Sequence, residues 1–215
     1  MEHLTLLVYL IFLLGGISIL SMVILHIVSP EFDPSWRMIS EYALGKNKWL
    51  ITIFFLFWGS ATILTAGLLF QIVESFWAKL GSVLVLISGI GAIMGGLFDV
   101  KHKLHGLSFM LGVPTLPIGA LMVSYHLATI PGWENHKSFL LWSAHSLWMS
   151  VVLMAVTMMI LFSGFKKHNI QMGPNDEPPK SLPSDVIKLS GYANRLLVLS
   201  DIFWLFVLGY INLSF

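Results

Sequence analysis

Three side chains near the ends of apolar segments are of types that bind divalent metals: His26, Asp99 and His105. Three protein ligands and one open position are typical of catalytic zinc, whose bound water becomes a nucleophile near neutral pH. Zinc is therefore a candidate cofactor of a hydrolase, with His105, Asp99 and Glu41 as its catalytic set. The spacing matches no recognised metal motif, however. Asp99 could instead pair with Arg195 or hydrogen-bond to His105.

Two arginines indicate a different chemistry, the binding of phosphate. A guanidinium group binds phosphate bidentately and stays charged. Arg195 lies near the start of an apolar segment, and Arg37 precedes Ser40 and Glu41 in a polar stretch. We expect these four residues to bind a ligand such as a lipid headgroup. Alternatively, Arg195 neutralises an aspartate such as Asp201, and Arg37 pairs with Glu41 four positions later.

Two further ionisable residues, His145 and Asp201, interrupt long apolar segments. Such residues are costly in a bilayer and mark functional sites by default. We expect Asp201 to face the interior of the protein. Serines near His145 suggest a nucleophile pair, but no acid orients this histidine and no Gly-x-Ser-x-Gly elbow is present. Packing or a hydrogen bond within the membrane is the favoured interpretation of His145.

The composition places all of these residues in a membrane protein. Of 215 residues, 56% are hydrophobic and 11% are charged, and the mean hydropathy is +0.83. Soluble domains carry about 25% charged residues, so this chain cannot cover itself with a polar surface. The same figures exclude a nucleic-acid-binding protein. The absence of cysteine excludes disulfides, thiolate catalysis and cysteine-ligated metals.

Six stretches have the roughly 20 apolar residues that a membrane-spanning helix needs. Only helices and closed barrels satisfy the backbone in lipid, and these stretches are too long for barrel strands. The sequence therefore predicts one all-α domain over residues 1–215, a polytopic bundle of six transmembrane helices. The expected spans are 4–28, 49–73, 76–98, 104–128, 138–163 and 191–213.

Positive charge predicts the orientation of the bundle. Ten lysines and arginines fall in the first, third and fifth loops and at the start of the last span, against only Lys79 and Lys137 on the other side. Basic loops stay in the cytoplasm. Both termini are therefore expected outside, in a multi-pass protein of the cell (plasma or inner) membrane. The candidate residues at span ends then gather on the cytoplasmic face.

Two loops differ in character. The first retains Phe32, Trp36 and Tyr42, and residues 35–44 could form an interfacial amphipathic helix. Such a helix could act as a lid or headgroup-binding element, or could simply anchor at the interface. The loop over 164–190 is predicted to be flexible and cytoplasmic, because residues 174–185 are rich in proline and charge.

Small residues and prolines predict how the spans pack. Gly91 and Gly95 form a small-xxx-small face that lets another helix approach closely. Pro114 and Pro117 should kink the fourth span, because proline lacks the backbone N–H that a helix interior needs.

Several short motifs, in order along the six spans, resemble the uncharacterised membrane family catalogued as domain of unknown function 998. A looser likeness exists to the Frag1/DRAM-type membrane proteins. The first resemblance implies a polytopic bacterial membrane protein and supplies no reaction; Phe98 stands where that family often has proline. The motifs are His26, Ser29-Pro30, Ser40-Glu41 and Gly45, then Gly96-Leu97-Phe98-Asp99 and Leu104-His105-Gly106, and finally Gly191 and Arg195.

Three functional hypotheses follow. The first is a membrane protein that binds or organises lipid at the cytoplasmic leaflet through its His/Asp/Arg cluster. Its partners would be membrane lipids and further copies of itself, with no nucleic acid. The second is the metal-dependent lipid hydrolase described above. The third is a small-solute or proton-coupled transporter using Asp99, Asp201 and His145, against which the lack of an inverted repeat counts.

Overall fold

The computed structural model describes residues 2–171, 179 and 181–214. Within these residues the chain is helical and forms no strand. Six helices are long and apolar enough to cross a membrane, with α4 and α5 together forming the fourth. The predicted all-α bundle is therefore confirmed. The helices are α1 (Glu2–Val28), α2 (Lys48–Ile72), α3 (Phe76–Leu97), α4 (His105–Gly112), α5 (Thr115–Leu127), α6 (Lys137–Lys167) and α7 (Ser190–Asn212), with 3₁₀ segments η1 (Ile39–Leu44) and η2 (Trp133–His136).

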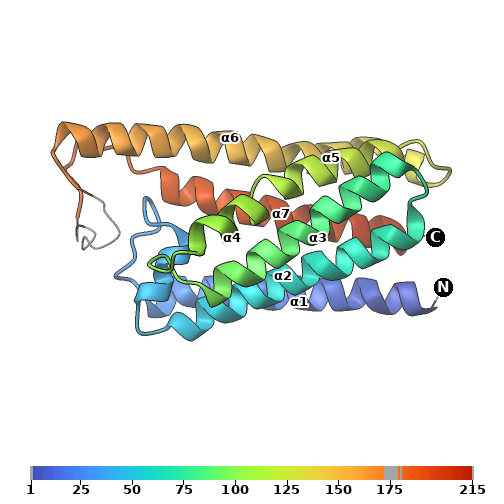
Figure 1. The fold of residues 1–215 in the computed structure, drawn as a ribbon, viewed down its shortest axis with the longest axis horizontal. Coiled ribbons are helices and arrows are strands. Elements are labelled where there is room, and N and C mark those ends of the chain that lie inside the picture. The colour runs from blue at the N-terminus through green and yellow to red at the C-terminus, as the bar shows by residue number, and fades with distance from the viewer. Residues whose placement is uncertain (1, 172–178, 180, 215) are drawn as a thin grey trace.

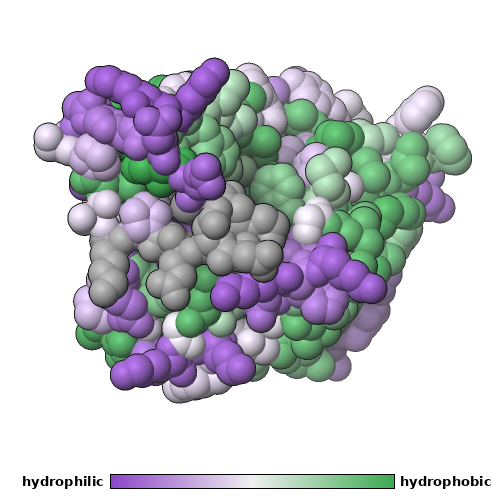
Figure 2. Space-filling view, turned by 60° about the vertical axis from the view of Figure 1, so that its left-hand side comes forward, coloured by the Kyte–Doolittle hydropathy of each residue, from purple (hydrophilic) through white to green (hydrophobic). Residues whose placement is uncertain are grey.

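The helices lie side by side in an elongated bundle, and both termini are at the same end (Figure 1). The opposite end carries loop one, which we define as residues 29–47 between α1 and α2, together with the α3–α4 and α6–α7 connections. We call it the loop-one end. Hydrophilic side chains gather on this end, and hydrophobic side chains cover the adjoining flank (Figure 2). Its cytoplasmic assignment stays a prediction from charge.

Helix α7 is the innermost element of the bundle. It packs against α6, α1 and α2, and it is the most buried of the six spans, whereas α6 is the least. Residues of α7 that are polar are therefore held inside the protein: Arg195 is 7% exposed and Asp201 is 3% exposed. The interior position of Asp201 agrees with the prediction.

The fourth span is broken, as its prolines predicted. Helix α4 ends at Gly112 and α5 begins after Pro114. Ser88 donates a hydrogen bond of 2.7 Å to the carbonyl oxygen of Gly112, so the opened backbone has an internal partner, as lipid requires. A Cβ on Gly91 would collide with the backbone of Gly112. The predicted small-residue contact therefore brings α3 and α4 together.

The connection between α6 and α7 is partly packed. Of the segment predicted to be flexible, residues 172–178 and 180 lie outside the described residues. Leu182 and Val186, further along, are buried in an apolar cluster with Trp36 of loop one and Phe165 of α6. Residues 181–186 therefore cover loop one instead of forming a free linker.

Candidate functional site

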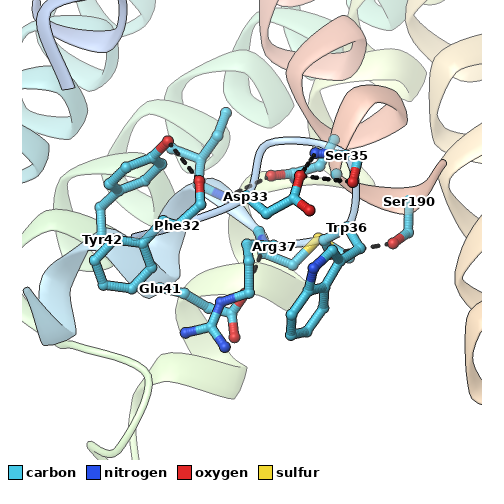
Figure 3. A network of polar contacts seen from close by, with 12 residues as sticks. Phe32, Asp33, Ser35, Trp36, Arg37, Glu41, Tyr42 and Ser190 are labelled. Atoms are coloured by element: carbon cyan, nitrogen blue, oxygen red, sulfur yellow. Dashed lines mark hydrogen bonds and ion pairs between the residues drawn. The ribbon is translucent and has the colours of Figure 1, made fainter. Parts of the chain in front are cut away.

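Loop one is attached to the start of α7 by four hydrogen bonds that involve its backbone (Figure 3 shows its side chains). The partners are more than 150 positions apart in the sequence. The backbone carbonyls near the middle of the loop accept three of the bonds, and one loop N–H donates the fourth. The donor–acceptor pairs are Gly191 N to Ser35 O (3.0 Å), Ser190 Oγ to Trp36 O (3.2 Å), Arg195 Nη1 to Arg37 O (2.7 Å) and Ile39 N to Asn194 Oδ1 (2.8 Å).

Arg195 is the centre of this attachment. Besides the loop carbonyl, its guanidinium donates to the carbonyl of Gly191 at 2.9 Å, to His26 Nε2 at 2.7 Å and to the hydroxyl of Tyr42 at 3.4 Å. Four of its five N–H groups therefore have acceptors in the protein. The arginine is occupied as a structural tie, and the prediction that it binds lipid phosphate gains no support from this geometry.

Gly191 is required for the close approach of loop one. A Cβ at this position would collide with the carbonyl oxygen of Pro34 and lie 2.7 Å from the nitrogen of Trp36 and 2.8 Å from the oxygen of Arg37. All three are backbone atoms, which cannot move aside as a flexible side chain can. Gly191 and Arg195, the two residues of the α7 motif, thus both serve to dock loop one.

The hydrogen bonds of His26 argue against its predicted role as a zinc ligand. Its Nδ1 lies 2.6 Å from the carbonyl oxygen of Met22, which can only accept, so Nδ1 carries the proton. The lone pair on Nε2 then accepts the N–H of Arg195. A metal needs that lone pair.

The structure does not assemble the predicted metal set. Among the described residues, no group of three or more His, Asp or Glu side chains is placed to hold a metal ion. Asp99 is exposed, and its Oδ1 accepts the backbone N–H of Lys101 at 2.9 Å. His105 Nδ1 lies 2.9 Å from the carbonyl of Phe98, and among the described residues His105 and Asp99 form no hydrogen bond with each other. The structure therefore contradicts the predicted zinc site of His26, Asp99 and His105.

Arg37 and Glu41 are engaged with each other, as their spacing allowed. Arg37 Nε lies 3.3 Å from Glu41 Oε2; because its N–H is not aligned for a hydrogen bond, the contact is an ion pair (Figure 3). The same carboxylate oxygen accepts the N–H of Met38 at 2.7 Å. Burial raises the pKa of Glu41, and these two contacts oppose the rise. The Arg37 guanidinium also lies 5.2 Å from the ring of Phe32 and 5.0 Å from that of Trp36.

The predicted interfacial helix over residues 35–44 is wrong in form. The N–H and hydroxyl of Ser35 both donate to Asp33 Oδ1, at 2.9 and 2.6 Å, which stabilises a turn. A 3₁₀ segment follows from Ile39. The apolar side chains that suggested an amphipathic surface helix, including Trp36 and Tyr42, are instead buried. Loop one therefore plugs the end of the bundle.

A cavity of about 80 Å³ lies beneath η1. Its walls come from α2, α3, α4 and α7, so residues from five elements meet there. It contains His105 and Ser40 of the predicted site residues, but neither Asp99 nor Glu41. The lining residues are Ile39, Ser40, Phe55, Trp58, Gly91, Ala92, Gly95, His105, Ser108, Phe109, Gly112, Val113, Asn194, Leu197 and Val198.

One wall residue, Trp58, has an unsatisfied donor. Trp58 is 5% exposed, and its indole Nε1–H is buried without a hydrogen-bond acceptor. Buried polar groups are nearly always paired, so an exception needs an explanation. The sequence analysis missed both Trp58 and Asn194. A signal for Trp58 existed, because this tryptophan lies deep within a span and not at the interface that tryptophan favours.

The remaining intramembrane polar residues are separate from the cavity. His145 accepts a hydrogen bond of 2.8 Å from Trp148 Nε1 at its Nδ1, and its Nε2 lies 3.1 Å from the hydroxyl of Tyr125. The favoured interpretation, a hydrogen bond within the membrane, agrees with this geometry. Asp201 has no hydrogen bond or ion pair with any other described residue.

A family model described as "Protein of unknown function (DUF998)" matches residues 12–211. The chain belongs to this family. The resemblance carried by the sequence motifs is thereby confirmed, and the likeness to Frag1/DRAM-type proteins stays a prediction. No curated protein and no solved structure matches the chain.

In this member of the DUF998 family, the motifs have distinct physical roles. His26, Gly191 and Arg195 attach loop one to α7. The Leu104-His105-Gly106 motif begins α4 and places His105 in the cavity wall. The protein is an integral membrane protein of six apolar helices, and its motifs converge on one end of the bundle.

Proposed function

We propose that this protein binds a membrane lipid at the leaflet of the loop-one end, with part of the lipid's polar end in the cavity. The carrying observation is the cavity itself, together with one of its wall residues, Trp58, whose buried Nε1–H has no acceptor. Ligand sites are typically apolar hollows with a few convergent polar groups. His105, Ser40 and Asn194 supply those groups here.

The position of the cavity supports a ligand that arrives from the bilayer. Phe109 of α4 lines the cavity and is 45% exposed, so the wall of the cavity is part of the lipid-facing surface. Lysines 46, 101 and 103 belong to the connections at this end, and Lys48 begins α2 there. By the distribution of positive charge, the leaflet is the cytoplasmic one.

The hydrolase alternative has less support. Ser108 is the hydroxyl nearest in sequence to His105, yet it donates to the carbonyl of Leu104 at 3.0 Å and not to the histidine. A nucleophile needs its base within hydrogen-bond reach. The predicted base Glu41 pairs with Arg37 instead.

Lipid retention tests the proposal. The protein is purified in mild detergent, and bound lipid is extracted and quantified by mass spectrometry. Ala92→Leu adds side-chain volume to the cavity wall, so the retained lipid should fall at least fivefold. Ala155→Leu on the exposed face of α6 adds the same atoms elsewhere and should retain lipid as the wild type does. Equal retention in all three proteins would overturn the proposal.

A further inference from the structure

The hydrogen-bonding capacity of the cavity wall indicates what kind of lipid fits. An indole N–H only donates. Trp58 lines the cavity, and its buried Nε1–H has no partner in the protein, so a ligand that brings an acceptor oxygen to this donor would satisfy it. An acyl carbonyl, from an ester or an amide, is the acceptor oxygen that membrane lipids carry just below their polar ends.

His105 offers the opposite capacity. Its Nδ1 lies 2.9 Å from the carbonyl oxygen of Phe98. Because a carbonyl only accepts, Nδ1 carries the proton of the neutral ring, and the lone pair on Nε2 is left as an acceptor. The ligand therefore needs a donor, such as a hydroxyl group. The hydroxyl of Ser40, which has no partner among the described residues, can adapt to either role.

The cavity carries no charge to match a charged headgroup. Its lining residues, all within the described part of the chain, include no lysine, arginine, aspartate or glutamate. Arg195 has four acceptors within the protein, and Arg37, whose guanidinium forms an ion pair with Glu41, is not among the residues that line the cavity. A buried phosphate without a cationic partner would pay a large desolvation penalty. The polar end of the ligand is therefore uncharged.

The cavity is large enough for the polar end of a ligand. The space open to the centres of water-sized molecules is about 80 Å³, which is several times the roughly 10–15 Å³ that one water needs by that measure. It admits the hydroxyl and carbonyl region of a lipid. The chains would extend into the bilayer along the exposed side of α4, where Phe109 lies.

From these four observations, we propose that the cavity selects an uncharged lipid that carries both a free hydroxyl and an acyl carbonyl. The carbonyl accepts from Trp58 Nε1–H, and the hydroxyl donates to His105 Nε2. Diacylglycerol and ceramide share this chemistry, one with an ester and the other with an amide. This inference rests on the proposed function and names the class of its ligand.

Titration with short-chain lipids tests the inference. The wild-type protein in detergent micelles is titrated with dioctanoylglycerol or N-octanoylsphingosine, and the complexes are counted by native mass spectrometry. Three analogues of dioctanoylglycerol change one group each: the 3-acetyl ester blocks the hydroxyl, the dioctyl ether removes the carbonyls, and dioctanoyl phosphatidic acid replaces the hydroxyl with a charged phosphate. We expect each analogue to bind at least tenfold more weakly, because the first two leave a buried group unpaired and the third buries a charge without a cationic partner.

Two variants separate direct contact from a structural role. Trp58→Phe removes the N–H, so it should weaken binding of dioctanoylglycerol about tenfold and leave the ether analogue unchanged. His105→Phe should weaken dioctanoylglycerol about tenfold and leave the 3-acetyl ester unchanged. A merely structural residue would weaken every ligand alike, which would overturn its assigned contact.

The outcomes distinguish this inference from the proposed function. If phosphatidic acid binds as tightly as dioctanoylglycerol and Ala92→Leu abolishes both, the cavity binds lipid but the uncharged class is wrong. If no lipid binds and Ala92→Leu has no effect on retained lipid, both proposals fail. Tighter binding of N-octanoylsphingosine than of dioctanoylglycerol, with the same response to Trp58→Phe, supports the inference and identifies the amide form.

Discussion

Two polar regions meet at the loop-one end, and their hydrogen-bonding states differ. Around Arg195, four of the arginine's five N–H groups are paired, with His26, Tyr42 and two backbone carbonyls. Asn194, the neighbour of Arg195 on α7, and Trp58 of α2 line a cavity, and the buried Nε1–H of Trp58 has no acceptor. The first region finds its partners within the chain, whereas under our proposal a bound lipid supplies the acceptor that the second region lacks.

We interpret this difference as one between residues that hold the architecture and residues that we propose bind a ligand. Both regions contain residues of types that sequence analysis flags as functional, since buried arginine and histidine are costly in a membrane. The hydrogen bonds by which Arg195 holds loop one in place offset the free-energy cost of burying its charge. Asn194 belongs to both regions, because its Oδ1 accepts a hydrogen bond from the backbone N–H of Ile39 and the residue also lines the cavity. Loop one is therefore held as a fixed roof over the cavity.

The largest predicted effect comes from breaking the Arg195 region. Arg195→Lys keeps the charge but cannot reach four acceptors in the same fork geometry. Buried carbonyls would lose their partners, and we expect the free energy of unfolding to fall by about 3 kcal/mol. Unfolding by SDS in detergent micelles measures it. A loss below about 1 kcal/mol would show that the tie contributes little and that the two regions do not differ as described.

The next effect concerns the approach of loop one to α7. Gly191→Ala places a Cβ against three backbone atoms, and we expect a cost of about 2–3 kcal/mol from overpacking. Proteolysis should also become faster within residues 29–47, because the loop loosens. Gly106→Ala is the control, since nothing lies within 4 Å of the added Cβ. Equal stability of the two variants would contradict the close contact.

The features that sequence predicted are those set by local chemistry. The six spans follow from long apolar runs, and the break after Gly112 follows from Pro114, whose missing N–H acts within one helix. The contact of α3 with α4 was also predictable, because Gly91 has no side chain and so lets another helix approach closely. None of these features depends on knowing which distant segments meet.

The features that sequence missed depend on tertiary contacts. Ile39 and Asn194 are 155 positions apart, and no local pattern shows that the loop's backbone is paired with α7. His26 was of the right type for a metal, but its lone pair is taken by a residue 169 positions away. In the sequence, Trp58 is indistinguishable from an apolar core residue. Only the arrangement of five elements around it shows that its N–H lacks an acceptor.

A third prediction tests whether the cavity is free space. Ala92→Leu places extra side-chain atoms in the empty cavity instead of in packed core, so the free energy of unfolding should change by less than about 1 kcal/mol in lipid-free detergent. Ala120→Leu makes the same change in the apolar cluster at the other end, where Ala120 is fully buried, and should cost about 1–3 kcal/mol. A similar cost for both variants would mean that the cavity is not available to a ligand.

The smallest effect is expected from the exposed part of the loop-one attachment. Asp185 pairs with Lys167 at 2.7 Å and with His168 at 2.9 Å, which holds the segment whose Leu182 and Val186 cover Trp36. Hydrogen bonds from these two partners lower the pKa of Asp185 to about 2 from 3.8. The stabilisation is therefore present above pH 3.8 and is lost as the pH falls toward 2.

Thermal unfolding of Asp185→Asn across this pH range measures the contribution. The wild type should unfold at a slightly higher temperature than the variant at pH 5, and the difference should vanish near pH 2. High salt should reduce the difference at pH 5, because an exposed ion pair is screened. Glu31→Gln, an exposed carboxyl of loop one, provides the control for general charge effects. If instead the difference is independent of pH, then packing of Leu182 and Val186, and not this ion pair, holds the segment over Trp36.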